Sequence, residues 1–169
     1  MEKDLKTIQL FDEDGNEINF NVIAFFDMVN PETDEKSEYV IVQEVGYEDE
    51  NPFALKIIKD EEDNDMFELI DNEVNGYGQV FFNDGKHYKG FIKGTTFNGK
   101  GTIKFPSGSY YSGDFLNNEM HGFGEFKWDN GTIYQGEFSH NAITGQGKMV
   151  YTDGTIIIGK FINGVLQGR

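Results

Sequence analysis

The chain has 169 residues, no cysteine, and 30 acidic against 14 basic side chains, which gives a formal net charge of −16. Its length suits one or two small domains, and a hydrophobic content of 37% excludes wholesale disorder, because enough apolar surface can be buried to offset the ordering entropy. The lack of cysteine excludes disulfides, thiolate chemistry and sulfur-ligated zinc, and with neither a secretory signal nor a membrane-length apolar run in the sequence we expect a soluble, cytoplasmic protein.

The first 75 residues are predicted to form a small, strongly acidic β domain. Apolar and polar residues alternate over 7–11 and 18–22, and Asp14-Gly15 between these runs is typical of a hairpin turn. Three further strands are expected over 39–42, 53–58 and 66–70, and acidic turns separate them. Together these segments predict an antiparallel β-meander.

The order of these segments resembles the DUF1292 proteins, a small bacterial family of unknown function. The resemblance spans about residues 5–73, and it implies a bacterial, cytoplasmic protein without naming an activity. The acidic tail that is usual in that family is missing, because the chain continues into a different pattern. The matching residues are Ile8-x-Leu10-x-Asp12-Glu13-Asp14-Gly15-Asn16-Glu17, Glu38-Tyr39-Val40-Ile41-Val42 and Phe53-x-Leu55-x-Ile57.

Composition and charge both change near Val74-Asn75. Only two of the 21 glycines precede residue 76. Residues 1–75 contain 23 acidic and 5 basic side chains, whereas residues 76–169 contain 7 and 9, so their net charges are −18 and +2. An abrupt shift in two independent properties indicates a domain boundary, and we expect domains over 1–75 and 76–169 that abut without a flexible linker.

The second part is an internal repeat with a constant period of 23 residues. A period of this size is typical of arrays in which each unit buries its apolar face by stacking on its neighbours. The predicted units are 76–98, 99–121, 122–144 and 145–167, and a fifth begins at 168. The repeated glycines fall in four series: Gly76, Gly99, Gly122, Gly145 and Gly168; Gly78, Gly101, Gly124 and Gly147; Gly85, Gly108, Gly131 and Gly154; and Gly90, Gly113, Gly136 and Gly159.

Each unit is predicted to be a β-hairpin. Large apolar residues spaced two apart, such as Phe126 and Trp128, place their side chains on one face of a strand. The loop that follows ends in glycine, as in Asp129-Asn130-Gly131, which is typical of a type I turn whose last residue is left-handed. We therefore expect at least eight strands in residues 76–169, with left-handed backbone at Gly108 and Gly131.

This loop length also predicts the pairing inside each hairpin. Val80 should lie opposite Tyr88, and Gly78 should lie opposite Gly90. Because glycines have no side chain, we expect the paired glycines to leave room for the aromatic rings of the adjacent unit.

The repeated pattern resembles the MORN (membrane occupation and recognition nexus) repeat. Its Tyr-x-Gly-x-Phe element reads Tyr111-Ser112-Gly113-Asp114-Phe115 and Tyr134-Gln135-Gly136-Glu137-Phe138, and the resemblance covers residues 76–169. Ile92 replaces the final aromatic residue in the first copy, and Ile157 replaces the tyrosine in the last. The resemblance implies an elongated, single-layer antiparallel sheet whose concave, aromatic-lined face binds proteins, and lipid headgroup binding has been proposed for some members.

The repeated aromatic residues are the predicted partner-binding face. A ladder of rings without a second layer over it would be an exposed apolar patch of the kind that marks interaction sites. The alternative is that the same rings form a buried core and serve stability alone. The predicted face consists of Phe82, Tyr88, Phe105, Tyr111, Trp128, Tyr134 and Tyr151.

The sequence predicts no catalytic, cofactor or metal site. Asp12-x-Asp14-Gly15-Asn16 places glycine at the fourth position, whereas a calcium loop needs it at the sixth between two helices, so a plain hairpin turn is the better interpretation. His87, His121 and His140 occupy different repeat positions without metal-ligand spacing. We therefore expect a protein that is not an enzyme.

Three functions remain open. The first is a protein-interaction or scaffold module, with an acidic domain that tunes solubility or attracts a basic surface. The second is a peripheral binder of anionic lipid such as phosphoinositide, although the acidic domain would be repelled by that surface. The third is an immunity- or antitoxin-type protein that caps a basic partner. Nucleic acid is disfavoured by charge repulsion, and self-association through sheet edges is open. The lipid alternative would use Lys86, Lys89, Lys93, Lys100 and Lys104.

Overall fold

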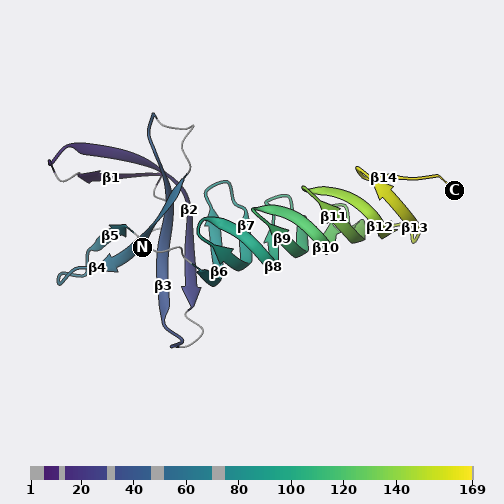
Figure 1. Ribbon diagram of the computed structural model, residues 1–169, viewed down its shortest axis with the longest axis horizontal. Helices are drawn as coiled ribbons and strands as arrows, with labels where there is room; N and C mark the ends of the chain where they lie inside the picture. Colours follow the sequence, from purple (N-terminus) through teal and green to yellow (C-terminus); the bar gives the residue numbers. More distant parts are fainter. Residues whose placement is uncertain (1–5, 12–13, 30–32, 47–51, 70–74, 169) are drawn as a thin grey trace. The chain divides into compact units, whose positions relative to one another are not determined.

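The computed structural model describes residues 6–11, 14–29, 33–46, 52–69 and 75–168 (Figure 1). These residues contain fourteen β-strands that pair antiparallel and no helix, which confirms the all-β prediction. The chain divides into two compact units. Unit 1 comprises residues 1–85 and 92–95, and unit 2 comprises residues 86–91 and 96–169.

Unit 1 is built on the predicted meander. Consecutive strands pair from β2 to β5, and β1 pairs with β2, so the five predicted strand segments are confirmed. Asp14-Gly15 lies in the loop of the β1–β2 hairpin, as predicted. The strands are β1 (Thr7–Phe11), β2 (Glu17–Val29), β3 (Lys36–Glu44), β4 (Phe53–Lys59), β5 (Asp65–Leu69) and β6 (Asn75–Phe82).

The alternating residues of these strands form the core of unit 1. The ring of Phe20 on β2 meets that of Phe53 on β4 edge to face, with centroids 5.5 Å apart. Of the three predicted acidic turns, two lie partly outside the described residues. The third is a turn in which the Asp60 carboxylate accepts hydrogen bonds from the backbone N–H groups of Glu62 and Asn64. The buried core residues are Ile8, Phe20, Val22, Phe25, Val40, Val42, Leu55 and Ile57.

Strand β2 pairs with two different strands along one edge. A register shift between Val22 and Ala24 separates its first half, which pairs with β1, from its second half, which pairs with β6. Phe26 lies opposite Val80 and Met28 lies opposite Gly78. The first strand of the repeats is therefore part of the same compact unit as the acidic strands. The predicted boundary residue Val74 lies outside the described residues, and the boundary itself stays a prediction.

Unit 2 contains most of the repeat array. From β8 onward each strand pairs with the next one in the chain, as the green-to-yellow strands of Figure 1 show. With β6, residues 76–169 hold more than the eight strands predicted. The strands are β7 (His87–Lys93), which runs from unit 2 into unit 1, then β8 (Thr96–Lys104), β9 (Tyr110–Leu116), β10 (Glu119–Lys127), β11 (Ile133–Ser139), β12 (Ala142–Val150), β13 (Ile156–Ile162) and β14 (Val165–Leu166).

The turns inside the hairpins have the predicted geometry. Gly108 and Gly131 have φ angles of 93° and 89°, in the left-handed region that glycine adopts without steric cost. The predicted pairing holds in the hairpins of unit 2, where Phe126 lies opposite Tyr134 and Gly124 lies opposite Gly136. Its equivalents Ile103–Tyr111 and Met149–Ile157 are also paired.

A second set of turns, between the repeats, was not predicted. Asn117-Asn118 and His140-Asn141 have positive φ angles at both residues, and their side chains reach back to the preceding unit. The Asn118 amide oxygen accepts a hydrogen bond from the backbone N–H of Phe97 at 2.7 Å, and the Asn141 amide oxygen accepts one from Met120 at 2.8 Å. Each asparagine therefore tolerates the left-handed turn and also ties two repeats together.

Candidate protein-binding face

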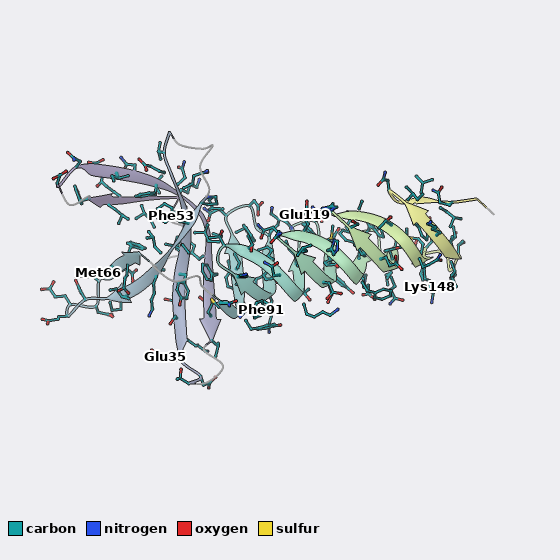
Figure 2. All side chains as sticks on the ribbon, viewed as in Figure 1. Glu35, Phe53, Met66, Phe91, Glu119 and Lys148 are labelled. Atoms are coloured by element: carbon teal, nitrogen blue, oxygen red, sulfur yellow. The ribbon has the colours of Figure 1, made fainter. Side chains whose placement is uncertain are left out.

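The repeated tyrosines and paired glycines share one face of unit 2, which we call the inner face. Gly113 lies opposite Gly124, and Tyr111 lies opposite Phe126. Directly opposed residues in an antiparallel pair point to the same side of the sheet, so all four lie on the inner face. The outer face carries the alternate residues, which are mostly polar. Figure 2 shows side chains projecting from the strands of unit 2 on both sides.

The paired glycines create the space in which each tyrosine lies. A Cβ atom at Gly124 would come within 2.5 Å of the Tyr111 hydroxyl oxygen, and one at Gly101 would come equally close to that of Tyr88. Each ring therefore covers a glycine of the next unit, which confirms the predicted reason for the glycines. Gly113 shows that the glycine of the tyrosine's own unit is needed as well, because a Cβ there would also lie 2.5 Å from the Tyr111 hydroxyl.

Hydrogen bonds fix these rings in place. The Tyr111 hydroxyl donates to the backbone carbonyl of Asp114 at 2.8 Å and lies 3.2 Å from that of His121. The Tyr134 hydroxyl makes the equivalent contacts with Glu137 and Thr144, both at 3.3 Å. A buried phenol that has its hydroxyl paired in this way satisfies both its apolar ring and its polar end.

The tyrosines alternate with phenylalanines in a continuous buried stack, which we call the tyrosine column. Neighbouring rings meet edge to face, with centroids 4.9–5.3 Å apart. At one end the ring of Phe97 stacks on Tyr88 at 3.6 Å. The order of rings in the tyrosine column is Tyr88, Phe115, Tyr111, Phe138, Tyr134 and Phe161.

Burial of the tyrosine column corrects one prediction. Tyr88, Tyr111 and Tyr134 are each 0% exposed, so the prediction that they present an exposed ladder to a partner is wrong. The physical reason is that each ring folds down over the paired glycines and is enclosed by two phenylalanines. These three tyrosines belong to the core of unit 2.

The tyrosine column predicts alkaline destabilisation of unit 2. Burial raises the pKa of Tyr111 and of Tyr134 above the usual value of 10, since the charged phenolate is poorly solvated there. Both groups ionise near pH 10 when unfolded and only at a higher pH when folded. Their contribution to stability is therefore complete below pH 10 and is lost as the pH rises toward their folded pKa. In that window each tyrosine should lower the free energy of unfolding by about 1.4 kcal/mol per pH unit.

The measurement is chemical denaturation of the full chain between pH 8 and pH 11.5. Tyr111→Phe, which cannot ionise, should show a shallower loss of stability over the same range. An equal slope for this variant and for the wild type would show that Tyr111 does not carry the effect.

A second group of inner-face aromatic residues stays accessible. Phe105, Trp128 and Tyr151 follow β8, β10 and β12 directly, and we call them the turn-end row. Phe105 and Trp128 are half-buried and Tyr151 is 40% exposed. The Phe126 ring supports the row, with centroids 4.7 Å from Trp128 and 6.1 Å from Phe105.

Identical backbone contacts hold the three residues of the turn-end row. Each donates its backbone N–H to the residue four positions later, at 2.9 Å, and each carbonyl accepts from the glycine three positions later, at 2.9–3.0 Å. The row therefore repeats with the hairpins. Phe82 is half-buried at the same repeat position, and its carbonyl accepts from Gly85, but it belongs to unit 1.

The outer face is a network of polar side chains. The Glu125 carboxylate accepts hydrogen bonds of 2.6 Å from the Tyr110 hydroxyl and from the Gln135 amide. These bonds hold the pKa of Glu125 below its usual value, and the bond to Glu125 raises the pKa of Tyr110. The Thr102 and Ser112 hydroxyls lie 2.9 Å apart. This network spans neighbouring repeats and satisfies the polar groups that the sheet presents there.

The lysines of the lipid alternative lie on or near β7 and β8. Lys89, Lys93, Lys100 and Lys104 are exposed, and Lys86 is half-buried. The Lys100 ammonium forms an ion pair of 2.7 Å with Asp114. Lys93 belongs to unit 1 and the other four belong to unit 2, and the lipid-contact role of the five stays a prediction.

The described residues contain no group of three or more acidic or histidine side chains able to hold a metal ion. His121 and His140 lie with ring centroids 5.9 Å apart, and His140 Nδ1 is 2.7 Å from Glu119 Oε2. Among the described residues there is no helix long and apolar enough to cross a bilayer.

Comparison with known proteins supports both parts of the sequence interpretation. The model of the MORN repeat family matches residues 88–110, 111–133 and 134–156, which are three consecutive repeats in a frame that begins at the tyrosine and overlap all four predicted copies. The N-terminal region is similar to a UPF0473 protein of Clostridium beijerinckii. The identity is 30% over 80 residues, which cover 47% of this chain and 83% of the relative.

Proposed function

The chain belongs to the UPF0473 family, the group predicted above as DUF1292, and from this premise we propose that it is a non-catalytic protein-binding module that uses the turn-end row. MORN repeats in general are associated with protein or lipid binding.

The observation that carries the proposal is the accessibility of the turn-end row beside a buried tyrosine column. Phe105, Trp128 and Tyr151 are aromatic side chains held at equal intervals on a rigid backbone. Tryptophan and tyrosine are enriched among residues that dominate binding energy, and a rigid support lowers the entropy lost on association. A protein partner that contacts this row would gain most of its affinity there.

The acidic strands of unit 1 give the proposed partner a second property. Residues 1–75 have a net charge of −18, and the resulting field would attract a basic protein and speed its encounter with this chain. A scaffold role, or the capping of a basic partner as in an immunity protein, would both follow from this arrangement. Lower salt should therefore raise the association rate more than it lowers the dissociation rate.

The experiment that tests the proposal is affinity capture from a bacterial lysate with the full chain as bait. The wild type is compared with Tyr151→Ala, which trims an exposed ring of the turn-end row. Its matched control is Phe123→Ala, which removes a ring that is 60% exposed on the outer face. A genuine partner should be retained by the wild type and the control and lost with Tyr151→Ala. Its measured affinity should fall about 30-fold, or about 2 kcal/mol.

Partners that bind all three baits equally would contradict the proposed face. The full chain is needed because β6, the first strand of the repeats, pairs with β2, so removing residues 1–75 would leave β6 without that neighbour.

The lipid alternative has one observation in its favour, which is that Phe91 (labelled in Figure 2) is exposed and stands between Lys89 and Lys93 in the sequence. Basic side chains near an anionic membrane contribute about 1 kcal/mol each, but Lys100 is already paired with Asp114 and the acidic strands oppose approach. Sedimentation of the full chain with phosphoinositide-containing vesicles at low salt separates the two ligands. Binding that is lost with Lys89→Glu and kept with Tyr151→Ala would favour lipid.

A further inference from the structure

We infer that the turn-end row binds a proline-rich segment in the polyproline II conformation, which names the class of partner for the face proposed above and rests on that proposal. The inference comes from the spacing of the row, from its unpaired donors and from the charge of the adjoining turns. Each of these selects among the conformations that a bound peptide can adopt.

The spacing of the row matches a polyproline II helix. Phe105, Trp128 and Tyr151 follow β8, β10 and β12, which are two strands apart in the sheet. Adjacent strands lie about 4.8 Å apart, so the row repeats about every 9.6 Å. A polyproline II helix has three residues per turn and rises 3.1 Å per residue, so its equivalent side chains recur about every 9.3 Å.

Other peptide conformations match less well. An α-helix presents equivalent side chains seven residues apart, which is about 10.5 Å. Across the two intervals of the row a helix accumulates a mismatch of about 1.8 Å, whereas polyproline II accumulates about 0.6 Å. A β-strand repeats on one face every two residues, or about 6.7 Å; three repeats come within about 0.9 Å of two intervals of the row, but no residue on that face falls at the middle position. The row therefore favours every third residue of an extended, left-handed ligand.

The row also offers hydrogen-bond donors that such a ligand needs. The carbonyl groups of polyproline II make no internal hydrogen bonds and remain free to accept. Within the described part of the chain, neither the Trp128 indole N–H nor the Tyr151 hydroxyl has a hydrogen-bond partner. Both side chains combine an apolar ring for the prolines with a donor for the intervening carbonyls, which is how aromatic surfaces recognise proline-rich segments.

The turns beside the row select for a basic residue in the ligand. Trp128 is followed by Asp129, and Tyr151 is followed two residues later by Asp153, both exposed. The Asp153 carboxylate accepts the backbone N–H of Thr155 at 2.8 Å, which fixes it in the turn. The turn after Phe105 holds Pro106 and Ser107 and has no charge. An arginine in the ligand should therefore lie toward the Trp128–Tyr151 end.

The test uses Trp128 as the probe, since it is the single tryptophan of the chain. The full chain is titrated with a ten-residue peptide of three Pro-Pro-Ala units followed by Arg, and Trp128 emission is recorded. The peptide controls are the same sequence with glycine in place of proline and an amphipathic helical peptide of equal length and charge. We expect saturable binding of the proline peptide and affinities at least tenfold weaker for both controls.

Variants locate the binding on the row. Tyr151→Ala should weaken the proline peptide at least tenfold, Tyr151→Phe should show a smaller loss because only the hydroxyl is removed, and Phe123→Ala on the outer face should bind like the wild type. Asp153→Asn should weaken the peptide that ends in arginine and leave one that ends in alanine unchanged. Circular dichroism and melting temperature confirm that each variant is folded.

Three results would overturn the inference: no saturable change with the proline peptide at millimolar concentration, equal binding of the glycine peptide, or binding that Tyr151→Ala leaves unchanged. Failure of the inference is distinguishable from failure of the proposed function. If captured partners depend on Tyr151 but the proline peptide does not bind, the face is right and the ligand class is wrong. If neither depends on Tyr151, both are wrong.

Discussion

Gly124→Ala is expected to destabilise the repeat array by about 3 kcal/mol or more. The new Cβ would lie 2.5 Å from the Tyr111 hydroxyl oxygen and 2.6 Å from its Cζ. Overpacking a close-packed core costs about 1–3 kcal/mol when neighbours can shift. Here the ring is enclosed by Phe115 and Phe138, and its hydroxyl donates to the Asp114 carbonyl and lies 3.2 Å from that of His121, so it has no room to move. The measurement is equilibrium unfolding of the full chain in urea.

Gly168→Ala is the matched control. Gly168 has no positive φ angle, and no atom lies within 4 Å of a Cβ built there, so its substitution should change stability by less than about 0.5 kcal/mol. A Gly124→Ala protein as stable as this control would mean that the paired glycines are not needed to hold the tyrosine.

Tyr111→Ala is expected to lower stability without weakening partner binding, whereas Tyr151→Ala is expected to weaken partner binding with little loss of stability. Truncation of Tyr111 removes a fully buried ring from the tyrosine column and should cost about 3–5 kcal/mol of folding free energy. Truncation of Tyr151, which is 40% exposed, should cost less than about 1 kcal/mol and should weaken partner binding about 30-fold.

The comparison requires measurements on folded protein. At a temperature where circular dichroism shows Tyr111→Ala to be folded, its affinity for a captured partner should match the wild type within about threefold. Tyr111→Phe provides the milder case, since it keeps the ring and leaves the Asp114 carbonyl without this donor, at a cost of about 1–3 kcal/mol. Loss of binding in folded Tyr111→Ala, with binding kept in Tyr151→Ala, would indicate that the tyrosine column, and not the turn-end row, is needed for partner binding.

The repeat period allowed the hairpins to be predicted from the sequence in detail. A 23-residue lattice with glycine at the end of each loop implied the positive φ angles of Gly108 and Gly131 and the pairing of Phe126 with Tyr134, and both are observed. These features depend on local geometry, where loop length and the conformational range of glycine leave few choices. The strands of the acidic meander were predictable for the same reason, because their apolar residues alternate.

The features that the sequence did not reveal depend on long-range contacts. The second half of β2 is almost continuously apolar, so its two-residue alternation is lost, and it was not assigned to a strand. The structure shows Ala24, Phe25 and Phe26 buried with β3 on one side and β6 on the other. A strand buried on both faces reads as a continuous apolar run, which was the available signal.

Burial of the tyrosines was missed for a related reason. A sheet without a second layer suggests that its rings are exposed, but Tyr111 folds over glycines of two neighbouring strands and is closed in by rings from two repeats. Asn118 and Asn141 were also missed, although asparagine at the turn between repeats is the residue type that tolerates positive φ and can donate or accept. The sequence alone therefore located the aromatic face, while packing decided which of its rings a partner can reach.

Fluorine NMR of the full chain labelled with 5-fluorotryptophan tests the central claim most directly, because Trp128 gives the single tryptophan signal. On addition of a purified partner the Trp128 resonance should shift in proportion to the bound fraction; the midpoint of the shift should need about 30-fold more partner with Tyr151→Ala and stay unchanged with Phe123→Ala. A partner that binds with full affinity while the Trp128 resonance stays in place would contradict the account and would move the binding face away from the turn-end row.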